Sequence, residues 1–248
     1  MNTDLHVVIP HYRVLPWLDA CLNTHQKRSK NPERIAYTVI TMEEDQTLAE
    51  EARTLVGSRA DVIWHPTHGM WGGQPLPSVL LLGSRLKLSV PYTLLVDPDA
   101  LMLAQDWDSR LRSLFADQEL VVAGINPRSI LTQFAGSVEW NWMAFRTQFW
   151  ADNVGHFDIA VAKCHDIGHI MTQAASQHGK RQHLWGLKSY ALDSSRSACV
   201  CGDDIHSEWA LHAFYSSRRR KDRNISAIEL AQMLTPAEEA LLIERYKP

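Results

Sequence analysis

The sequence has no long apolar runs, few cysteines and little net charge over its 248 residues. No apolar stretch approaches the roughly 20 residues that a helix needs to cross a bilayer, so we expect no transmembrane segment. The first residues, Met1–Asp4, lack the pattern of a signal peptide and lead directly into an apolar stretch. The formal net charge of −3 gives no overall indication of nucleic-acid binding.

The cysteines are too sparse to indicate a disulfide framework or a zinc site. They are Cys21, Cys164, Cys199 and Cys201. Only the last two lie close in sequence, and no histidine completes a convincing zinc spacing with them. We therefore expect reduced thiols in a cytoplasmic protein.

One basic cluster departs from the low net charge of the chain. It runs from Arg218 to Lys221, with Arg223 beyond it. The cluster fits the solvated end of a helix, and it also fits a patch for a phosphate-rich acceptor or a membrane surface. The sequence leaves these interpretations open.

Apolar stretches alternate with helical patterns through the first half of the chain. The patterns predict strands over residues 5–9, 35–40, 61–64 and 92–96, and helices from about 16 and over 47–56 and 77–88. Such alternation is typical of a parallel sheet covered on both faces, so we expect an α/β fold. In these sheets ligands bind at the carboxyl ends of the strands, which places residues 10–13, 42–45 and 97–99 at one edge.

The second half of the chain is less regular. Its patterns predict strands over 120–123, 143–145 and 183–185, and helices over 106–115, 147–153, 164–178, 206–216 and 236–246. The chain is near the upper length for one hydrophobic core. We therefore expect one domain that carries a C-terminal helical appendage.

Two acids, Asp97 and Asp99, stand directly after the apolar stretch 92–96, with Pro98 between them. On an extended chain, residues two apart point to the same face, about 6–7 Å apart at their Cα atoms. Like charges so close to a core are costly unless a cation joins them, and proline stiffens the link. A hard cation such as Mg²⁺ or Mn²⁺, bridging to a phosphate, suits this pair. The plainer interpretation is a pair of loop acids after a strand.

Four motifs follow one another in the first half of the chain. They are Val7-Val8-Ile9-Pro10-His11-Tyr12, then Glu43-Glu44-Asp45, then His68-Gly69-Met70-Trp71-Gly72-Gly73 with Leu82-Gly83-Ser84, and finally Val96-Asp97-Pro98-Asp99. In this order they resemble the family 2-type glycosyltransferases with the GT-A fold, in which the last of them is the DxD motif. The resemblance covers roughly residues 5–218 and rests on ordered motifs rather than on close identity.

Two later segments also resemble this family. The stretches 143–147 and 154–158 look like the segment before its acceptor-side acid, which normally follows a Glu at the start of a helix. Here the pair is His165-Asp166, which departs from the family by its His. The resemblance implies Asp166 as catalytic base, with Asp203 and Asp204 as alternatives. The segment from His212 to Arg218 resembles the one in which many such enzymes place a metal-binding histidine.

The resemblance implies a mostly parallel sheet flanked by helices. Residues 1–124 would form a Rossmann-like nucleotide-sugar-binding half, residues 125–220 an acceptor half, and residues 221–248 the helical appendage. The implied reaction moves a sugar from a nucleotide-diphosphate donor, a UDP-sugar first of all, to an acceptor hydroxyl with inversion. The acceptor is left open between a glycan, a lipid-linked group and a nucleic acid.

The resemblance also implies the residues of the site. Mn²⁺ or Mg²⁺ would be held by Asp97, Asp99 and His212, with His206 as the alternative histidine, and Asp97 could instead contact the ribose or metal-bound water. The nucleotide would be contacted by Pro10, Tyr12, Arg13, Glu44, Asp45 and Asp97. Trp71, Trp140, Trp142 and Trp185 either stack on an acceptor sugar or pack in the core.

Two other classes of protein share some of these features. A haloacid dehalogenase-type phosphatase also has Asp-x-Asp after an apolar strand, although its motif lies near the start of the domain. A non-catalytic nucleotide-sugar or glycan-binding module would keep the acids and need no base. Substitution of Asp166 separates this module from an enzyme.

Overall fold

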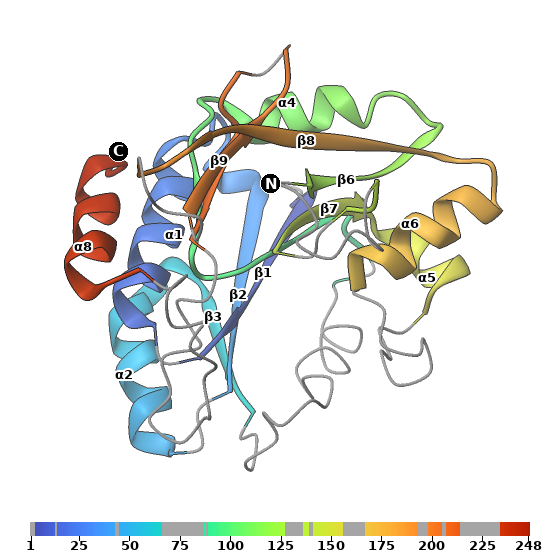
Figure 1. The fold of residues 1–248 in the computed structure, drawn as a ribbon. Helices are drawn as coiled ribbons and strands as arrows, with labels where there is room; N and C mark the ends of the chain where they lie inside the picture. The colour runs from blue at the N-terminus through green and yellow to red at the C-terminus, as the bar shows by residue number, and fades with distance from the viewer. Residues whose placement is uncertain are drawn as a thin grey trace, which may run out of the picture.

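The computed structural model shows one large sheet with helices on both faces (Figure 1). It describes residues 3–12, 14–42, 45–65, 87, 89–126, 136–138, 141–155, 167–192, 198–204, 207–213 and 234–248. Several predicted features lie outside these residues, namely the helix over 77–88, the motifs at 68–73 and 82–84, His206 and the basic cluster at 218–223.

The described strands form one ten-stranded sheet in the order β3-β2-β1-β4-β7-β6-β8-β9-β10-β5. Their bounds are β1 Leu5–His11, β2 Ile35–Thr41, β3 Asp61–Trp64, β4 Tyr92–Val96, β5 Ala100–Met102, β6 Leu120–Asn126, β7 Trp142–Arg146, β8 Arg181–Tyr190, β9 Ala198–Gly202 and β10 Ala210–Ala213. The strands predicted in the first half of the chain, β1 to β4, are all present.

The parallel part of the sheet consists of β3, β2, β1 and β4. Strand β1 lies in its middle and is buried along its whole length, as its unbroken apolar run predicts. Beyond β4 the sheet is mixed, because β7 runs antiparallel to both neighbours and β8, β9, β10 and β5 pair antiparallel. The α/β sheet flanked by helices is confirmed, but its parallel pairing is less extensive than predicted, since the short links around β9 leave no room for crossover helices.

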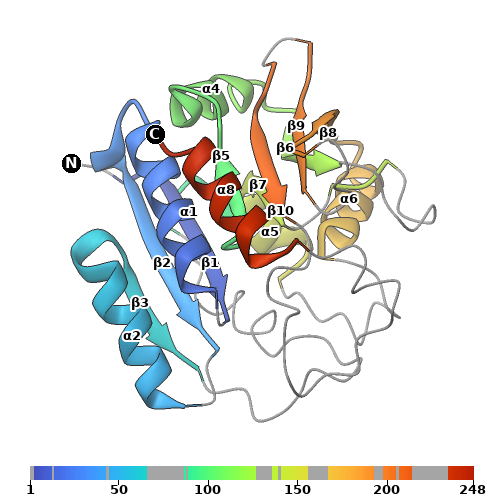
Figure 2. The same ribbon diagram turned by 60° about the vertical axis from the view of Figure 1, so that its left-hand side comes forward.

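The helices cover the two faces of the sheet unequally. Their bounds are α1 Leu15–Lys27, α2 Gln46–Val56, α4 Trp107–Leu114, α5 Thr147–Asn153, α6 Ile167–Gln177 and α8 Pro236–Arg245. Helices α1, α2 and α8 pack on one face and α5 and α6 on the other (Figures 1 and 2). All six agree with the predicted helices to within a few residues.

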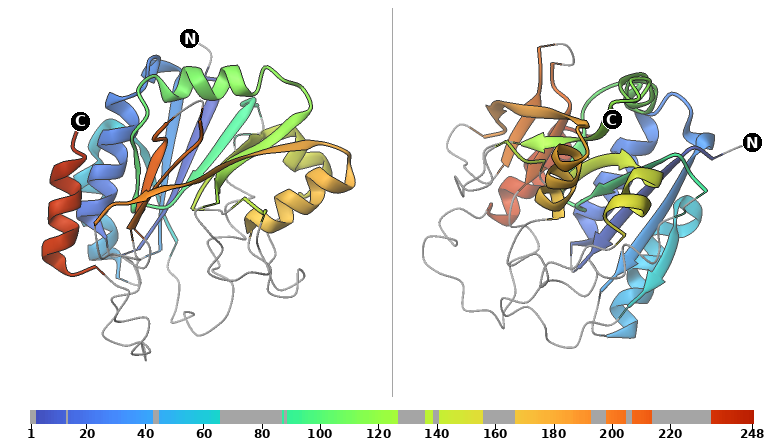
Figure 3. Two further views of the ribbon diagram at one scale, coloured as in Figure 1. Left: turned by 45° about the horizontal axis from the view of Figure 1, so that its top comes forward. Right: turned by 90° about the vertical axis from the view of Figure 1, so that its right-hand side faces the viewer.

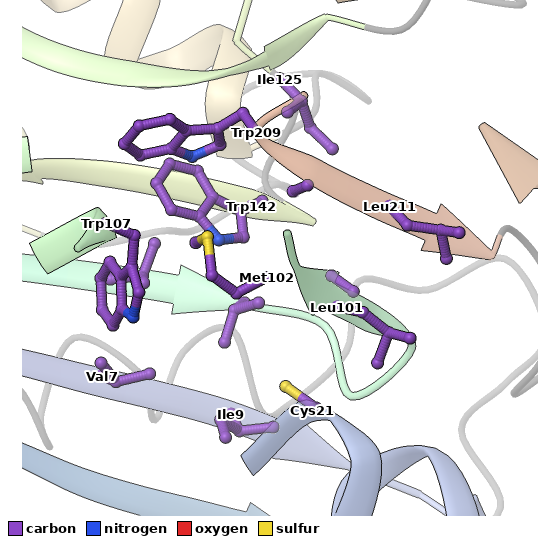
Figure 4. Close-up of a cluster of buried hydrophobic side chains, with 14 of the residues drawn as sticks. Val7, Ile9, Cys21, Leu101, Met102, Trp107, Ile125, Trp142, Trp209 and Leu211 are labelled. Atoms are coloured by element: carbon purple, nitrogen blue, oxygen red, sulfur yellow. The ribbon is translucent and has the colours of Figure 1, made fainter. Parts of the chain in front are cut away.

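The core divides into two layers, as the alternation of side chains along a strand requires. Val7 and Ile9 of β1 face the layer under α1, whereas Val8 between them faces the layer under α5 and α6. The first layer contains a group of tryptophans (Figure 4). Each central strand is therefore buried on both faces.

Helix α8 packs directly against α1 (Figure 3). Its Leu242 is fully buried in the layer under α1, and the guanidinium of Arg28, which directly follows α1, donates a hydrogen bond to the Tyr246 carbonyl at 3.0 Å. The C-terminal helix thus contributes to the main core, while the division of the chain into an acceptor half and an appendage stays a prediction.

The helix predicted over 206–216 is wrong where the structure describes this segment. Residues Ala210–Ala213 form β10, which pairs with β9 on one side and β5 on the other. Strands β5 and β9 were not predicted either. All three are short. Strand β5 pairs with β10, far away in the sequence, and β9 forms through its pairing with β8 and β10, so no local pattern marks these strands.

Candidate metal and nucleotide site

The two acids flank a tight turn at the end of β4. The Ala100 N–H donates to the Asp97 carbonyl at 3.0 Å, which closes a β-turn with Pro98 at its second position. Proline favours this position because its fixed φ matches the turn. The spacing predicts that both acids lie along one face of a continuing strand, which is not what the structure shows. Instead, the turn brings them together and reverses the chain into β5.

A third side chain, that of His212, reaches the two acids from β10. It lies opposite Ala100 in the pairing of β10 with β5. Its Nε2 atom lies 3.2 Å from Asp99 Oδ1 and 3.6 Å from Asp97 Oδ2. The Ala213 N–H donates to the Asp99 carbonyl at 3.1 Å and ties the strand to the turn. The structure thus brings together the three residues that the sequence nominated as metal ligands.

The three side chains of the site differ in their exposure to solvent. Asp99 and His212 are 5% and 4% exposed, whereas the Asp97 side chain is 20% exposed. Burial alone would lower the pKa of His212, but the Asp99 and Asp97 carboxylates outweigh it and raise this pKa from 6.5 to about 10. Two carboxylates thus lie against the ring, and this is a place where the fold favours positive charge.

These three side chains form a donor set suited to a divalent cation. One ligand atom from each lies within 4.8 Å of the other two, and no other group of three such side chains gathers among the described residues. Two carboxylates and an imidazole suit Mn²⁺ or Mg²⁺, and three protein ligands leave coordination positions for phosphate oxygens. The residues present fit the implied metal.

Asn141 lies behind the cluster and was not identified from the sequence. Its side-chain nitrogen is 3.1 Å from His212 Nδ1, and its backbone carbonyl accepts the Asp97 N–H at 2.8 Å. The residue directly precedes β7, which pairs with β4 so that Trp142 lies opposite Val96. Only the strand register places it beside the acids, and no sequence pattern gives that register.

Cys21 of α1 closes the floor of the site. Its thiol donates to the Asp97 carbonyl at a sulfur–oxygen distance of 3.8 Å. Burial, and then the Asp99 and Asp97 carboxylates, raise the pKa of this thiol. Cys21 is thus a neutral packing residue, consistent with the expected reduced thiols.

The residues predicted to bind the nucleotide lie at the same edge of the sheet as far as they are described. Pro10 and Tyr12 are buried at the carboxyl end of β1, the parallel neighbour of β4. Asp45 caps α2 and accepts a hydrogen bond from the Thr47 N–H at 2.7 Å. Arg13 and Glu44 lie outside the described residues, and all the nucleotide contacts, that of Asp97 included, stay predictions.

The predicted base, Asp166, also lies outside the described residues. The described part of helix α6 begins at Ile167, and the role of Asp166 stays a prediction. The two alternative acids are engaged elsewhere. Asp203 pairs with His183 at 2.7 Å, and the exposed Asp204 pairs with Lys188 at 3.1 Å.

The two described tryptophans among the four candidates for acceptor stacking are core residues. Trp142 and Trp185 are fully buried, and with Trp209 they form a compact aromatic group. Trp185 stacks on Trp209 at 4.4 Å between centroids, and Trp142 meets both edge-on. Trp71 and Trp140 lie outside the described residues.

Solved structures of glycosyltransferases share this fold. The mannosyltransferase PcManGT from Pyrobaculum calidifontis, solved with GDP-Man and Mn²⁺, matches with a TM-score of 0.57 and 15% identity, over 74% of this chain and 55% of that one. TarS residues 1–349 from S. aureus match with a TM-score of 0.52 and 16% identity, over 99% of this chain and 70% of that one. The same protein with UDP-GlcNAc gives a TM-score of 0.52 at 15% identity.

These likenesses establish the GT-A-type fold that the motifs predicted. Because identity is only 15–16%, they establish nothing finer. The chain spans about half of the mannosyltransferase and 36% of a longer TarS structure. No protein-family model matches the sequence, and no curated protein matches it. Among the described helices, none is long and apolar enough to cross a membrane.

Proposed function

We propose that this protein is a metal-dependent glycosyltransferase that moves a sugar from a nucleotide-diphosphate donor to an acceptor hydroxyl. The observation that supports it most is the cluster of Asp97, Asp99 and His212 at the carboxyl end of β4 in a GT-A-type sheet. Ligands of such sheets bind at this edge. A donor bound at this edge would bring its diphosphate to the cluster, where a divalent ion would neutralise the negative charge.

Each of the three side chains has a distinct part in this proposal. The buried Asp99 and His212 would hold the ion, and the more exposed Asp97 would also bind it or contact the ribose. When bound, Mn²⁺ or Mg²⁺ acts as a Lewis acid that neutralises the leaving diphosphate. The proposed contacts to the nucleotide are Pro10, Tyr12, Arg13, Glu44 and Asp45.

Asp166 is the proposed general base of an inverting transfer. A carboxylate within hydrogen-bond reach of the acceptor hydroxyl takes its proton as the sugar carbon is attacked from the face opposite the diphosphate. The neighbours were solved with GDP-Man and UDP-GlcNAc, so both UDP- and GDP-sugars are the first donors to test. The acceptor stays open between a glycan, a lipid-linked group and a nucleic acid, and a cytoplasmic location stays a prediction.

A thermal-shift panel tests the donor and the metal together. UDP, GDP, UDP-GlcNAc and GDP-Man are compared with and without Mn²⁺, because a ligand of the folded state raises its apparent stability. We expect at least one diphosphate to raise the Tm only when Mn²⁺ is present. If none does so in the presence of the metal, the proposed function is wrong.

Asp166→Asn separates the enzyme from a non-catalytic binding module. The substitution removes the base but keeps the size of the side chain, so transfer should collapse while donor binding persists. Unchanged transfer would remove Asp166 from the mechanism. The phosphatase alternative has little support, because the acids follow β4 rather than the first strand; release of phosphate from simple esters would revive it.

A further inference from the structure

Asn141 touches two of the three proposed metal ligands, one through its side chain and one through its backbone. Its amide nitrogen is 3.1 Å from His212 Nδ1. Its carbonyl oxygen is 2.8 Å from the Asp97 nitrogen. His212 comes from β10 and Asp97 from the turn after β4. Asn141, which directly precedes β7, therefore contacts two ligands from two different segments.

The contact at Nδ1 determines where the other ring nitrogen points. An imidazole is a rigid plane, so a hydrogen bond at Nδ1 fixes the rotation of the ring and the direction of Nε2. In His212 that direction leads to Asp99 Oδ1 at 3.2 Å and Asp97 Oδ2 at 3.6 Å. Histidines that ligate metals generally donate their second N–H to an oxygen, which fixes the tautomer and makes the ligating nitrogen more basic.

An asparagine can serve His212 both without and with an ion. Either atom of the amide can partner Nδ1: the N–H donates to a ring nitrogen without a proton, and the oxygen accepts from one that carries a proton. An ion on Nε2 requires the ring proton to be on Nδ1, and a half-turn of the amide then offers its oxygen as the acceptor. Asn141 is only 5% exposed, so water competes little for this contact.

We propose that Asn141 is a positioning residue that holds His212 ready to ligate the metal, while its backbone carbonyl fixes Asp97. This inference rests on the proposed function, since it assumes a divalent ion at the site. It assigns to the residue no contact with the donor or with the reacting atoms. The backbone contact does not depend on the side chain, so side-chain variants leave it in place.

Two variants with opposite expectations test the proposal. Asn141→Leu keeps the approximate volume and removes the partner of Nδ1, and we expect the Mn²⁺ affinity, measured by calorimetry, to fall about 10–100-fold. Asn141→Asp offers only acceptor oxygens, and we expect an affinity equal to or higher than that of the wild type. Equal affinity of Asn141→Leu and the wild type, or an equal loss in both variants, would overturn the proposal.

A second readout separates positioning from general loss of structure. Nitrogen chemical shifts of the His212 ring in the Mg²⁺-bound protein should show a proton on Nδ1 in the wild type and in Asn141→Asp. With His212→Ala in place, Asn141→Leu should cause no further loss of Mn²⁺ affinity; a further loss would show that it acts through something other than the histidine. Absence of Mn²⁺ binding to the wild type would count against the proposed function instead.

Discussion

Two regions of this protein contain buried histidines, and they shift the pKa of the same side chain in opposite directions. In the core, His6, His11 and His25 have pKa values lowered to about 4, chiefly by burial. At the end of β4, burial acts on His212 in the same direction, but two carboxylates raise its pKa to about 10. Burial by itself therefore identifies no function; the charge of the neighbours distinguishes a site from a core.

His25 illustrates the core type. Its Nδ1 donates to the Cys21 carbonyl at 2.8 Å, and its Nε2 accepts from the Trp142 indole at 3.3 Å. Trp107 meets the ring edge-on and donates to the His25 carbonyl at 2.7 Å. Neutral groups satisfy both ring nitrogens, which joins α1 to β7 and leaves no place for an ion.

The two regions are close neighbours. The Cys21 thiol lies 3.6 Å from His25 Nδ1 and 3.8 Å from the Asp97 carbonyl. A single side chain of α1, that of Cys21, therefore lies between the neutral polar core and the charged site. Substitutions on either side should consequently have different readouts, metal binding on one and stability on the other.

The largest effect is expected for Asp99→Asn, which removes the more buried of the two carboxylate ligands. The Mn²⁺ affinity should fall on the order of 100-fold or more, because loss of a ligand exceeds the 10–100-fold loss seen when only its support is removed. Metal-dependent transfer should fall with it. Calorimetry with Asp204→Asn as control checks this, since Asp204 is an exposed acid outside the cluster. Equal Mn²⁺ affinities of Asp99→Asn and Asp204→Asn would contradict the assignment of the metal site to the cluster at the end of β4.

His25→Leu should affect stability and leave metal binding unchanged. The Trp142 indole N–H would lose its acceptor in a dry core, at a cost of about 1–3 kcal/mol in the free energy of unfolding. Urea unfolding measures this loss, and His178→Leu, at an exposed position, serves as the control. A loss of Mn²⁺ affinity in His25→Leu without a loss of stability would mean that the core and the site are one unit.

Acid should destabilise the protein through the same core histidines. Their pKa is lowered on folding, so between pH 6.5 and 4 the unfolded chain binds protons that the folded chain refuses. The free energy of unfolding should therefore fall as the pH drops through this window, by at most about 1.4 kcal/mol per pH unit for each histidine. In urea unfolding, His25→Leu should show a shallower dependence than the wild type. Identical slopes would show that His25 is not neutral in the folded state.

The smallest effect is expected for Asp203→Asn. This acid pairs with His183 at 2.7 Å at the end of β9, outside the metal cluster. We expect a change of at most about 1 kcal/mol in the free energy of unfolding, with the Mn²⁺ affinity and transfer unchanged. A collapse of transfer in this variant, measured beside Asp166→Asn, would point to Asp203 rather than Asp166 as the base.

The parts of the fold with local signals could be predicted from the sequence. The apolar runs of β1, β2 and β4 and the periodic helices α1, α2 and α6 all lie close to their expected places. Strands β5, β9 and β10 could not be predicted, since each has five residues or fewer and is fixed by its pairing with other strands rather than by a local pattern. The pattern near His212 predicts a helix, but the long-range pairing of β10 with β5 makes this segment a strand.

The site was predictable to a similar degree. Asp97 and Asp99 are marked by their position after an apolar run, and the resemblance to a family nominated His212 although its secondary structure was wrong. Asn141 carries no such mark, because an asparagine before a short strand is typical of many loops. Its role follows only from the register of β7 against β4.

The most direct test of the central claim is a crystal structure with Mn²⁺ and the nucleoside diphosphate that stabilises the protein best, phased to show the anomalous signal of manganese. The account predicts one strong peak bounded by Asp97, Asp99 and His212, in contact with the diphosphate. A manganese peak elsewhere, or a diphosphate bound away from the end of β4, would contradict it.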